Sequence, residues 1–398
     1  IWPQELVESA TSDYYDSIIG SIKVLAANAV PMSLDETVNG VPEFRGLEKM
    51  NRKTSAGFPY FKAKNKICPI VDDKMVLTEE MVTQYNAAVE TWRTGQRTYE
   101  VFHQSLKDEP VKLSKEVART FQCSNMNLSL GLRQYFLPIL IPMIQMPEVF
   151  EMAVGCNAEG PEWDALIKSI SKFGEDRIVA GDYKNYDQKM SSQVLSAAFR
   201  IYIDIAREIG YKDEDITIMT VLATEVLFPV IHMNGDVFKI FGSMTSGNSL
   251  TTIGNCTCNS LLHRIVFFGL AKRMQIEVPM FKSVCSLMTY GDDCADSVRP
   301  GFDWFNHTNR QDFFAEYGIT YTMAVKDKSS VPFINICELS FLKRTPRYDE
   351  ELDMILGPLD ETSIFKSLQF ITKSQLSPEE SAAVNMDNAL AAWFYHGR

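Results

Sequence analysis

Two adjacent aspartates, Asp292 and Asp293, stand in the segment LMTYGDDCADSV between two apolar, strand-like runs. Adjacent carboxylates repel each other, and removing them from water is costly unless a positive charge compensates for it. A tight turn accounts for one aspartate, because Asp is common in turns. A divalent cation accounts for both. The segment therefore predicts a hairpin over 287–298 whose tip binds metal.

A third carboxylate, Asp182, ends the short apolar run RIVAGD at 177–182, which is typical of a buried strand. If this strand and the hairpin are neighbours, three carboxylates meet at one edge of a sheet. Hard oxygen ligands on rigid strands suit two Mg²⁺ ions that keep open positions for phosphates. For the Asp-Asp pair taken alone, a plain turn remains the alternative.

Polar residues at regular spacing follow these carboxylates. Asp187 comes five positions after Asp182, and SGNSLT at 246–251 is followed by Asn255. A Ser-Gly turn that leads into a helix can bring backbone N–H groups near a phosphate. Thr251 and Asn255 are four residues apart and so share a helix face. There a hydroxyl and an amide could face Asp187 and recognise a ribose 2′-OH; N-capping by Ser246 is the structural alternative.

The surrounding elements mix helices and strands. Periodicity predicts helices at 161–174 and 191–210, and a mostly apolar helix within 246–274. A hairpin at 226–242 has Asn234-Gly235 as a type I′ turn. Ser377, followed by a proline and two glutamates, predicts the start of a capped helix within 377–397. The expected fold class is α+β, with an antiparallel sheet backed by helices.

Composition narrows the classes of protein. The 398 residues are 45% hydrophobic, which is enough for more than one domain. No apolar run reaches the ~18 residues of a membrane span. Eight cysteines without a C-x-x-C pair, and five histidines without zinc-site spacing, indicate reduced thiols. The net charge of −12 argues against a nucleic-acid binder unless basic residues gather locally. They do gather, at 107–119, 326–328 and 343–347.

The order D-x4-D, SG-x3-T-x3-N and YGDD resembles the palm of viral RNA-dependent RNA polymerases of the picornavirus-like positive-strand RNA viruses. Four further segments agree. TSAGFPY (54–60) resembles the motif at which the template enters, and KDEPVKLSKEVARTF (107–121) the basic fingers motif. YGITYTMAVKDKS (317–329) resembles the palm segment with a lysine proton donor, and FLKR (341–344) the primer-grip hairpin. The resemblance thus covers most of the chain.

The resemblance implies a right-hand fold of fingers, palm and thumb. Fingers would occupy 1–140, with a hairpin insertion at 225–244. The palm would occupy 141–224 and 245–350, and a thumb that looks truncated would occupy 351–398. Relatives carry more residues before Thr54 and after Arg344, so a trimmed chain or a polyprotein fragment is expected.

The resemblance also implies roles for individual residues. Two Mg²⁺ ions, for which Mn²⁺ can substitute, would be held by Asp182 and Asp292, with Asp293 assisting. Asp187 and Asn255 would select ribonucleotides, within the loop and helix start formed by Ser246, Gly247 and Thr251. The triphosphate would be contacted by Lys107, Lys115 and Arg119. The template would be contacted by Thr54, Ser55 and Gly57, and the primer by Lys343 and Arg344. Lys328, with Lys326 as the alternative, would protonate pyrophosphate.

The expected partners are an RNA template and primer, NTPs and other viral replication proteins. Whether initiation uses a protein primer stays open. The expected location is the host cytoplasm, in a membrane-associated replication complex, without a transmembrane segment in this chain. Two alternatives remain: a nucleotidyl transferase such as a reverse transcriptase, against which Asp187 and Asn255 argue, and an inactive palm that binds RNA.

Overall fold

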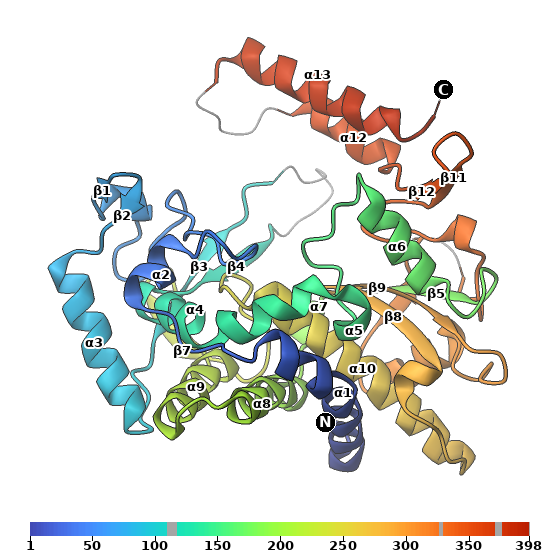
Figure 1. The fold of residues 1–398 in the computed structure, drawn as a ribbon, viewed down its shortest axis with the longest axis horizontal. Helices are drawn as coiled ribbons and strands as arrows, with labels where there is room; N and C mark the ends of the chain where they lie inside the picture. The colour runs from blue at the N-terminus through green and yellow to red at the C-terminus, as the bar shows by residue number, and fades with distance from the viewer. Residues whose placement is uncertain (110–117, 326–328, 371–375, 398) are drawn as a thin grey trace. The chain divides into compact units, whose positions relative to one another are not determined.

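The computed structural model describes residues 1–109, 118–325, 329–370 and 376–397 (Figure 1). Contacts divide the chain into two compact units. The first unit comprises residues 1–150 and 185–265, and the second comprises 151–184 and 266–398. The predicted hairpin insertion at 225–244 falls in the same unit as the N-terminal residues. The boundaries of fingers, palm and thumb stay a prediction.

The first unit is mainly helical. In chain order its helices are α1 (Gln4–Leu25), α2 (Leu34–Asn39), α3 (Glu79–Arg93), α4 (Met126–Leu140), α5 (Pro147–Phe150), α7 (Tyr186–Lys189), α8 (Ser192–Ile209), α9 (Asp213–Leu227) and the first part of α10 (Thr251–Met274). Helix α8 packs against α1 and α9, and α9 also packs against α3 and α4. The prediction for 191–210 is confirmed, because Ser191 caps α8 and Gly210 ends it in the left-handed conformation.

Two small sheets belong to the first unit. The larger has the order β4-β3-β6-β7, formed by β4 (Thr120–Cys123), β3 (Val101–Leu106), β6 (Val230–Met233) and β7 (Asp236–Lys239). Strands β3 and β6 are parallel, and β6 and β7 form the predicted hairpin. Its turn residues Asn234 and Gly235 have φ of +51° and +95°, as a type I′ turn requires. Strands β1 (Ile70–Val71) and β2 (Lys74–Met75) form the smaller sheet.

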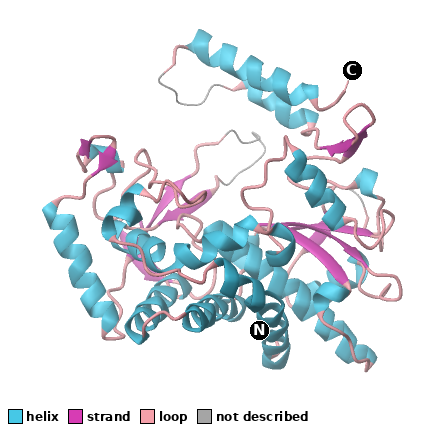
Figure 2. Ribbon diagram, viewed as in Figure 1, coloured by secondary structure: helices cyan, strands magenta, loops and turns pink. Residues whose placement is uncertain are grey.

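The second unit is built on an antiparallel sheet of order β10-β5-β9-β8, which Figure 2 shows in magenta. Its strands are β10 (Tyr321–Met323), β5 (Ile178–Tyr183), β9 (Asp293–Val298) and β8 (Cys285–Tyr290). Helix α6 (Pro161–Ile170) packs against β8 and β9, and α11 (His307–Glu316) packs against β5 and β10. This arrangement confirms the α+β prediction and the 287–298 hairpin.

Helix α6 packs on the core of the sheet and ends earlier than the sequence predicts. Trp163, Ile167 and Ile170 are buried together with Ala180 of β5 and Ala295 of β9. The predicted helix over 161–174 stops at Ile170, because the Phe173 N–H donates to Ser297 Oγ at 3.0 Å and Gly174 takes a φ of +133°. These contacts turn the chain towards β5.

The remaining elements of the second unit follow the sheet in the chain. They are β11 (Arg347–Asp349), β12 (Met354–Leu356), α12 (Glu361–Gln369) and α13 (Pro378–Phe394). Helices α12 and α13 pack side by side (Figure 1). The predicted start of α13 is confirmed: Ser377 and Glu380 form a reciprocal capping box.

Candidate metal and nucleotide site

The three predicted carboxylates lie at one end of the antiparallel sheet. Asp293 begins β9, and Gly291 and Asp292 form the tip of the β8–β9 hairpin, where Gly291 has a φ of +67°. Asp182 lies in β5, one position beyond the pair formed by Gly181 and Cys294. Directly opposed residues of antiparallel strands project from the same face. The register therefore brings Asp182 next to Asp293.

The three carboxylates also interact electrostatically. The pKa of Asp293 is raised from 3.8 to about 7, mainly by burial and to a smaller extent by the charges of Asp292 and Asp182. A hydrogen bond from the Leu342 N–H, at 2.7 Å from Asp293 Oδ2, acts in the opposite direction. Burial and like charge both disfavour an ionised carboxylate here.

The donor set suits a hard cation. Among the described residues, no group of three or more His, Cys, Asp or Glu side chains could hold a metal ion. Mg²⁺ does not need such a group, because it is usually bound by one or two carboxylates together with water and substrate phosphate oxygens. Asp182 and Asp292, with Asp293 beside them, therefore fit Mg²⁺ or Mn²⁺.

Two contacts that the sequence did not indicate hold these strands in place. Gly181 precedes Asp182, and a Cβ atom there would lie 2.0 Å from the Tyr321 ring. On the face of β9 opposite Asp293, Asp296 accepts from Arg310 Nη1 at 2.5 Å and from Nη2 at 2.7 Å. Both side chains are fully buried. Buried paired charges of this kind can fix the position of a strand against a helix.

The predicted ribose-reading residues both belong to the first unit. Asp187 lies in α7, and its carbonyl oxygen accepts from the Met244 N–H at 2.9 Å. Asn255 lies in α10, and its carbonyl oxygen accepts from the Tyr186 hydroxyl at 2.9 Å. The side-chain oxygen of Asn255 is buried and has no hydrogen-bond partner among the described residues. An unsatisfied buried acceptor is uncommon and is suited to a donor from a ligand.

The loop before α10 is shaped by its own polar groups. The Thr251 hydroxyl lies 3.1 Å from the Thr245 carbonyl and 3.0 Å from the Asn248 carbonyl, to which it donates. It is therefore engaged within the loop. Just before the helix the Asn248 side chain accepts from the Leu250 N–H at 2.8 Å, and the described contacts show no N-capping bond from Ser246. Ser246 is exposed.

Gly247 is the point of closest approach between this loop and β4. A Cβ atom on Gly247 would lie 2.3 Å from the Gln122 carbonyl oxygen. The Ser124 N–H donates to the Gly247 carbonyl at 3.1 Å. Only glycine fits here, because the obstacle is backbone and cannot rotate away.

The predicted triphosphate contacts meet at the end of the β3–β4 pair. The Lys107 N–H donates to the Arg119 carbonyl at 2.9 Å. The Lys107 side chain lies 3.7 Å and that of Arg119 lies 3.4 Å from the carboxylate of Glu109. The two cations are exposed and Glu109 is half-buried, so these ion pairs are weak. Lys115, Lys326 and Lys328 lie outside the described residues.

The predicted template residues form a loop, residues 54–60, held from below by Lys64. Lys64 is buried, and its Nζ donates to Thr54 Oγ1 at 2.7 Å and to the Ser55 carbonyl at 2.8 Å. Burial lowers the pKa of Lys64. The Thr54 hydroxyl in turn donates to the Asn51 carbonyl at 2.8 Å, so it is used within the loop. Gly57 has a φ of +73°. Lys64 was missed because no local spacing distinguishes it from the lysines around it.

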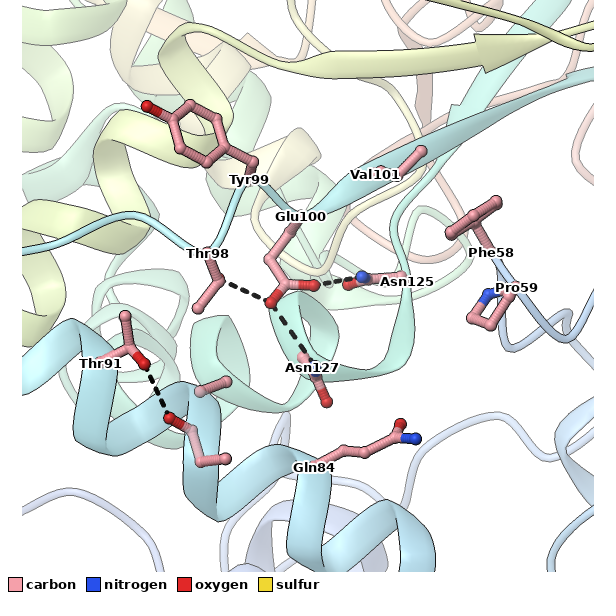
Figure 3. Close-up of a pocket in the computed structure, with 12 residues that line it drawn as sticks. Phe58, Pro59, Gln84, Thr91, Thr98, Tyr99, Glu100, Val101, Asn125 and Asn127 are labelled. Carbon is pink, nitrogen blue, oxygen red and sulfur yellow. Dashed lines mark hydrogen bonds between the residues drawn. The ribbon is translucent and has the colours of Figure 1, made fainter.

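A pocket of about 440 Å³ lies beside this loop, with Phe58 and Pro59 at one side (Figure 3). Its polar wall centres on Glu100, whose carboxylate accepts from the Thr98 hydroxyl at 2.7 Å and from the Asn125 amide. Burial raises the pKa of Glu100. Because Asn125 also caps α4, Glu100 ties the start of β3 to the start of that helix. The pocket wall thus supports the loop.

The predicted primer-grip residues Lys343 and Arg344 differ in availability. Arg344 is mostly buried, and its guanidinium donates to the Gly357 carbonyl and, at 3.4 Å, to Glu159. Arg344 therefore links the turn to the segments that contain Gly357 and Glu159. Lys343 is exposed.

The chain was compared with known families and structures. The model of the family described as viral RNA-dependent RNA polymerase matches residues 13–398. The chain belongs to this family. It is 26% identical to the replicase polyprotein of cricket paralysis virus, over 99% of the chain and 24% of the polyprotein. It is 27% identical to that of Drosophila C virus, over 92% of the chain and 22% of the polyprotein. The chain thus spans about a quarter of the length of these replicase polyproteins.

A solved structure shows the same fold. The Sicinivirus 3Dpol RNA-dependent RNA polymerase matches with a TM-score of 0.72 and 18% identity, over 96% of this chain and 81% of that one. The right-hand polymerase fold is therefore confirmed. Within the described part of the chain, no helix combines the length and apolar character needed to cross a membrane.

Proposed function

We propose that this chain synthesises RNA on an RNA template by two-metal nucleotidyl transfer. The observation that carries the proposal is the meeting of Asp182, Asp292 and Asp293 at one edge of the palm sheet, where the first two raise the pKa of the third. Family membership supplies the reaction class. The two-metal assignment, the roles of single residues and the division into fingers, palm and thumb are parts of the proposal.

In the proposed reaction, the 3′-hydroxyl of a primer attacks the α-phosphate of an NTP and pyrophosphate leaves. Bound Mg²⁺ would lower the pKa of the attacking hydroxyl and stabilise charge on the leaving oxygens. Asp182 and Asp292 would bind the ions. Lys107 and Arg119 would leave their ion pairs with Glu109 and contact triphosphate oxygens instead. Arg119 is suited to bidentate contact. Lys115 is proposed for the same role.

Proton transfer and strand contacts complete the proposal. Lys328, or Lys326, would protonate the pyrophosphate. The loop that contains Thr54, Ser55 and Gly57 would guide the template. Within the loop, the Thr54 hydroxyl donates to the Asn51 carbonyl, and the Ser55 hydroxyl accepts from the Gly57 N–H at 3.0 Å. Lys343 would contact the primer strand, and Arg344 would support it from behind.

Asp187 and Asn255 are proposed to select ribonucleotides. The buried, unpartnered side-chain oxygen of Asn255 supports this role, because a ribose 2′-OH is a donor that a deoxyribose lacks. A site built to hydrogen-bond a hydroxyl rejects the analogue without it, since its own polar group is then left unpaired. This pair argues against a reverse transcriptase.

The proposed partners are an RNA template and primer, NTPs and other replication proteins of the virus. A protein-linked primer remains an alternative to an RNA primer. The proposed location is a membrane-associated replication complex in the host cytoplasm.

Nucleotide selectivity tests this proposal. Incorporation of one NTP and of the matching dNTP is measured on a short RNA template–primer for wild type, Asp187→Ala and Asn255→Ala. Loss of one hydrogen bond to a buried group is worth about 1–3 kcal/mol, so the NTP preference should fall by roughly tenfold or more. Unchanged selectivity in both variants would remove the assigned roles. RNA binding without incorporation by the wild type would favour the inactive-palm alternative.

A further inference from the structure

The turn at Phe341–Arg344 has an unusual backbone. The Phe341 N–H donates to the Arg344 carbonyl at 3.0 Å, and the Arg344 N–H donates to the Phe341 carbonyl at 2.9 Å. The two central residues, Leu342 and Lys343, have φ of +54° and +57°. These values define a type I′ turn, which normally carries Asn or Gly. Side chains such as Leu and Lys rarely adopt the left-handed conformation, so the turn is strained.

Contacts on each side of the turn hold it in this conformation. Phe341 is fully buried, and its ring stacks on Trp163 with centroids 6.5 Å apart. The Asp360 N–H donates to the Lys343 carbonyl at 2.7 Å. Arg344 donates to the Gly357 carbonyl. The surrounding structure therefore imposes the turn against the preference of its residues.

The strained turn contacts Asp293 through its backbone. The reciprocal bonds of the turn use the N–H groups of Phe341 and Arg344, and the N–H of the central residue Leu342 points out of the turn. That group donates to Asp293 Oδ2 at 2.7 Å. The bond spans 49 positions of the chain and joins the tip of one turn to the first residue of β9.

We propose that the Leu342–Lys343 turn is a positioning element for metal binding. By holding Oδ2 of Asp293, it would fix the orientation of the carboxylate and leave Oδ1 available to the metal that Asp182 and Asp292 would bind. Relaxation of the turn frees Asp293 to rotate, so the site loses affinity for a divalent cation. This inference rests on the proposed metal site, and it gives Lys343 a conformational role separate from any contact of its ammonium with the primer.

Lys343 allows charge and conformation to be separated. Lys343→Gly and Lys343→Ile both remove the ammonium. Glycine adopts the left-handed conformation without strain, whereas a β-branched residue is a genuine outlier there. Lys343→Asn is the matched control, because Asn loses the charge but tolerates this conformation.

The test is calorimetric titration of the full chain with Mn²⁺ alone, without RNA or NTP. Lys343→Gly and Lys343→Asn should bind Mn²⁺ within about twofold of wild type, whereas Lys343→Ile should bind about tenfold more weakly, given the cost of this conformation. All three variants should lose affinity for primer–template equally if the ammonium contacts the primer. Equal Mn²⁺ affinity of the Gly and Ile variants overturns the inference. So does an absence of Mn²⁺ binding by wild type.

The same substitution is also made in the Asp293→Asn variant, to test whether Lys343→Ile acts through a general loss of folding. In Asp293→Asn, where the carboxylate is gone, changing Lys343 to Ile should not alter Mn²⁺ affinity further. A further loss of similar size would show a general effect of the substitution and would overturn the inference. Primer extension by wild type is measured separately. If the variants show the predicted order of Mn²⁺ affinities but wild type does not extend the primer, the proposed function alone is refuted. If wild type extends the primer but Lys343→Gly and Lys343→Ile bind Mn²⁺ equally well, the inference alone is refuted.

Discussion

Replacement of Arg310 by Met should strongly destabilise the second unit. Asp296 and Arg310 are both fully buried, and two N–O contacts of 2.5 and 2.7 Å join them. After the substitution, the Asp296 carboxylate would keep the Cys285 thiol, at 3.2 Å, as a weak donor. Breaking a buried pair by removing one partner costs about 3–5 kcal/mol. For a cooperative unit of 150–250 residues this corresponds to a fall of about 10 °C in the unfolding midpoint.

A double-mutant cycle makes this reasoning testable. Replacing a buried pair by apolar residues of similar volume is often neutral, so Asp296→Leu combined with Arg310→Met should recover most of the loss. The free energies of unfolding of wild type, both single variants and the double variant are measured in urea. A loss below about 1 kcal/mol in Arg310→Met, or additive losses in the double variant, would refute the assignment of a tight, desolvated pair.

Three further predictions concern the residues around the proposed site. Because the folded-state pKa of Asp293 is raised to about 7, its proton stabilises the metal-free fold below that pH, and this stabilisation is lost as pH rises through 7. In chelator, the stability of wild type relative to Asp293→Asn should therefore fall by about 1.4 kcal/mol per pH unit between pH 5 and about 6.5 and level off above pH 7, whereas a constant difference from pH 5 to 8 would contradict it. Gly181→Ala should abolish nucleotide incorporation, since its Cβ would lie 2.0 Å from the Tyr321 ring and displace Asp182; full incorporation would show that the strand can adjust. Lys64→Met should weaken template binding several-fold at unchanged NTP affinity, because the template loop loses two hydrogen bonds of about 1 kcal/mol each; equal template affinity would contradict its role.

Local patterns predicted the elements that carry the chemistry. The β8–β9 hairpin, the strand that holds Asp182, helix α8 with its caps and the Asn234-Gly235 turn follow from periodicity and turn residues. Helix α9 was missed because its apolar run continues without interruption into β6, so periodicity cannot separate helix from strand there. The same continuity explains why the predicted hairpin began at 226, inside the helix.

Contacts between distant residues could not be predicted in this way. The pairs Arg310–Asp296 and Leu342–Asp293 and the support of Thr54 by Lys64 join segments whose approach is set by tertiary packing. No spacing in the chain encodes them. The left-handed backbone of Leu342 and Lys343 even contradicts their intrinsic preference, so it could not be predicted from the motif that assigned Lys343 and Arg344 to primer contact.

The most direct test of the account is primer extension on a short RNA template–primer, with four NTPs and Mg²⁺, for wild type and Asp292→Asn. Asp292 is exposed at the hairpin tip, so its replacement should leave the fold intact. The account predicts extension by wild type in Mg²⁺ or Mn²⁺, none in chelator, and a loss of at least about a hundredfold in the variant. Extension by Asp292→Asn at the wild-type rate would contradict the claim that the paired aspartates bind the catalytic metal.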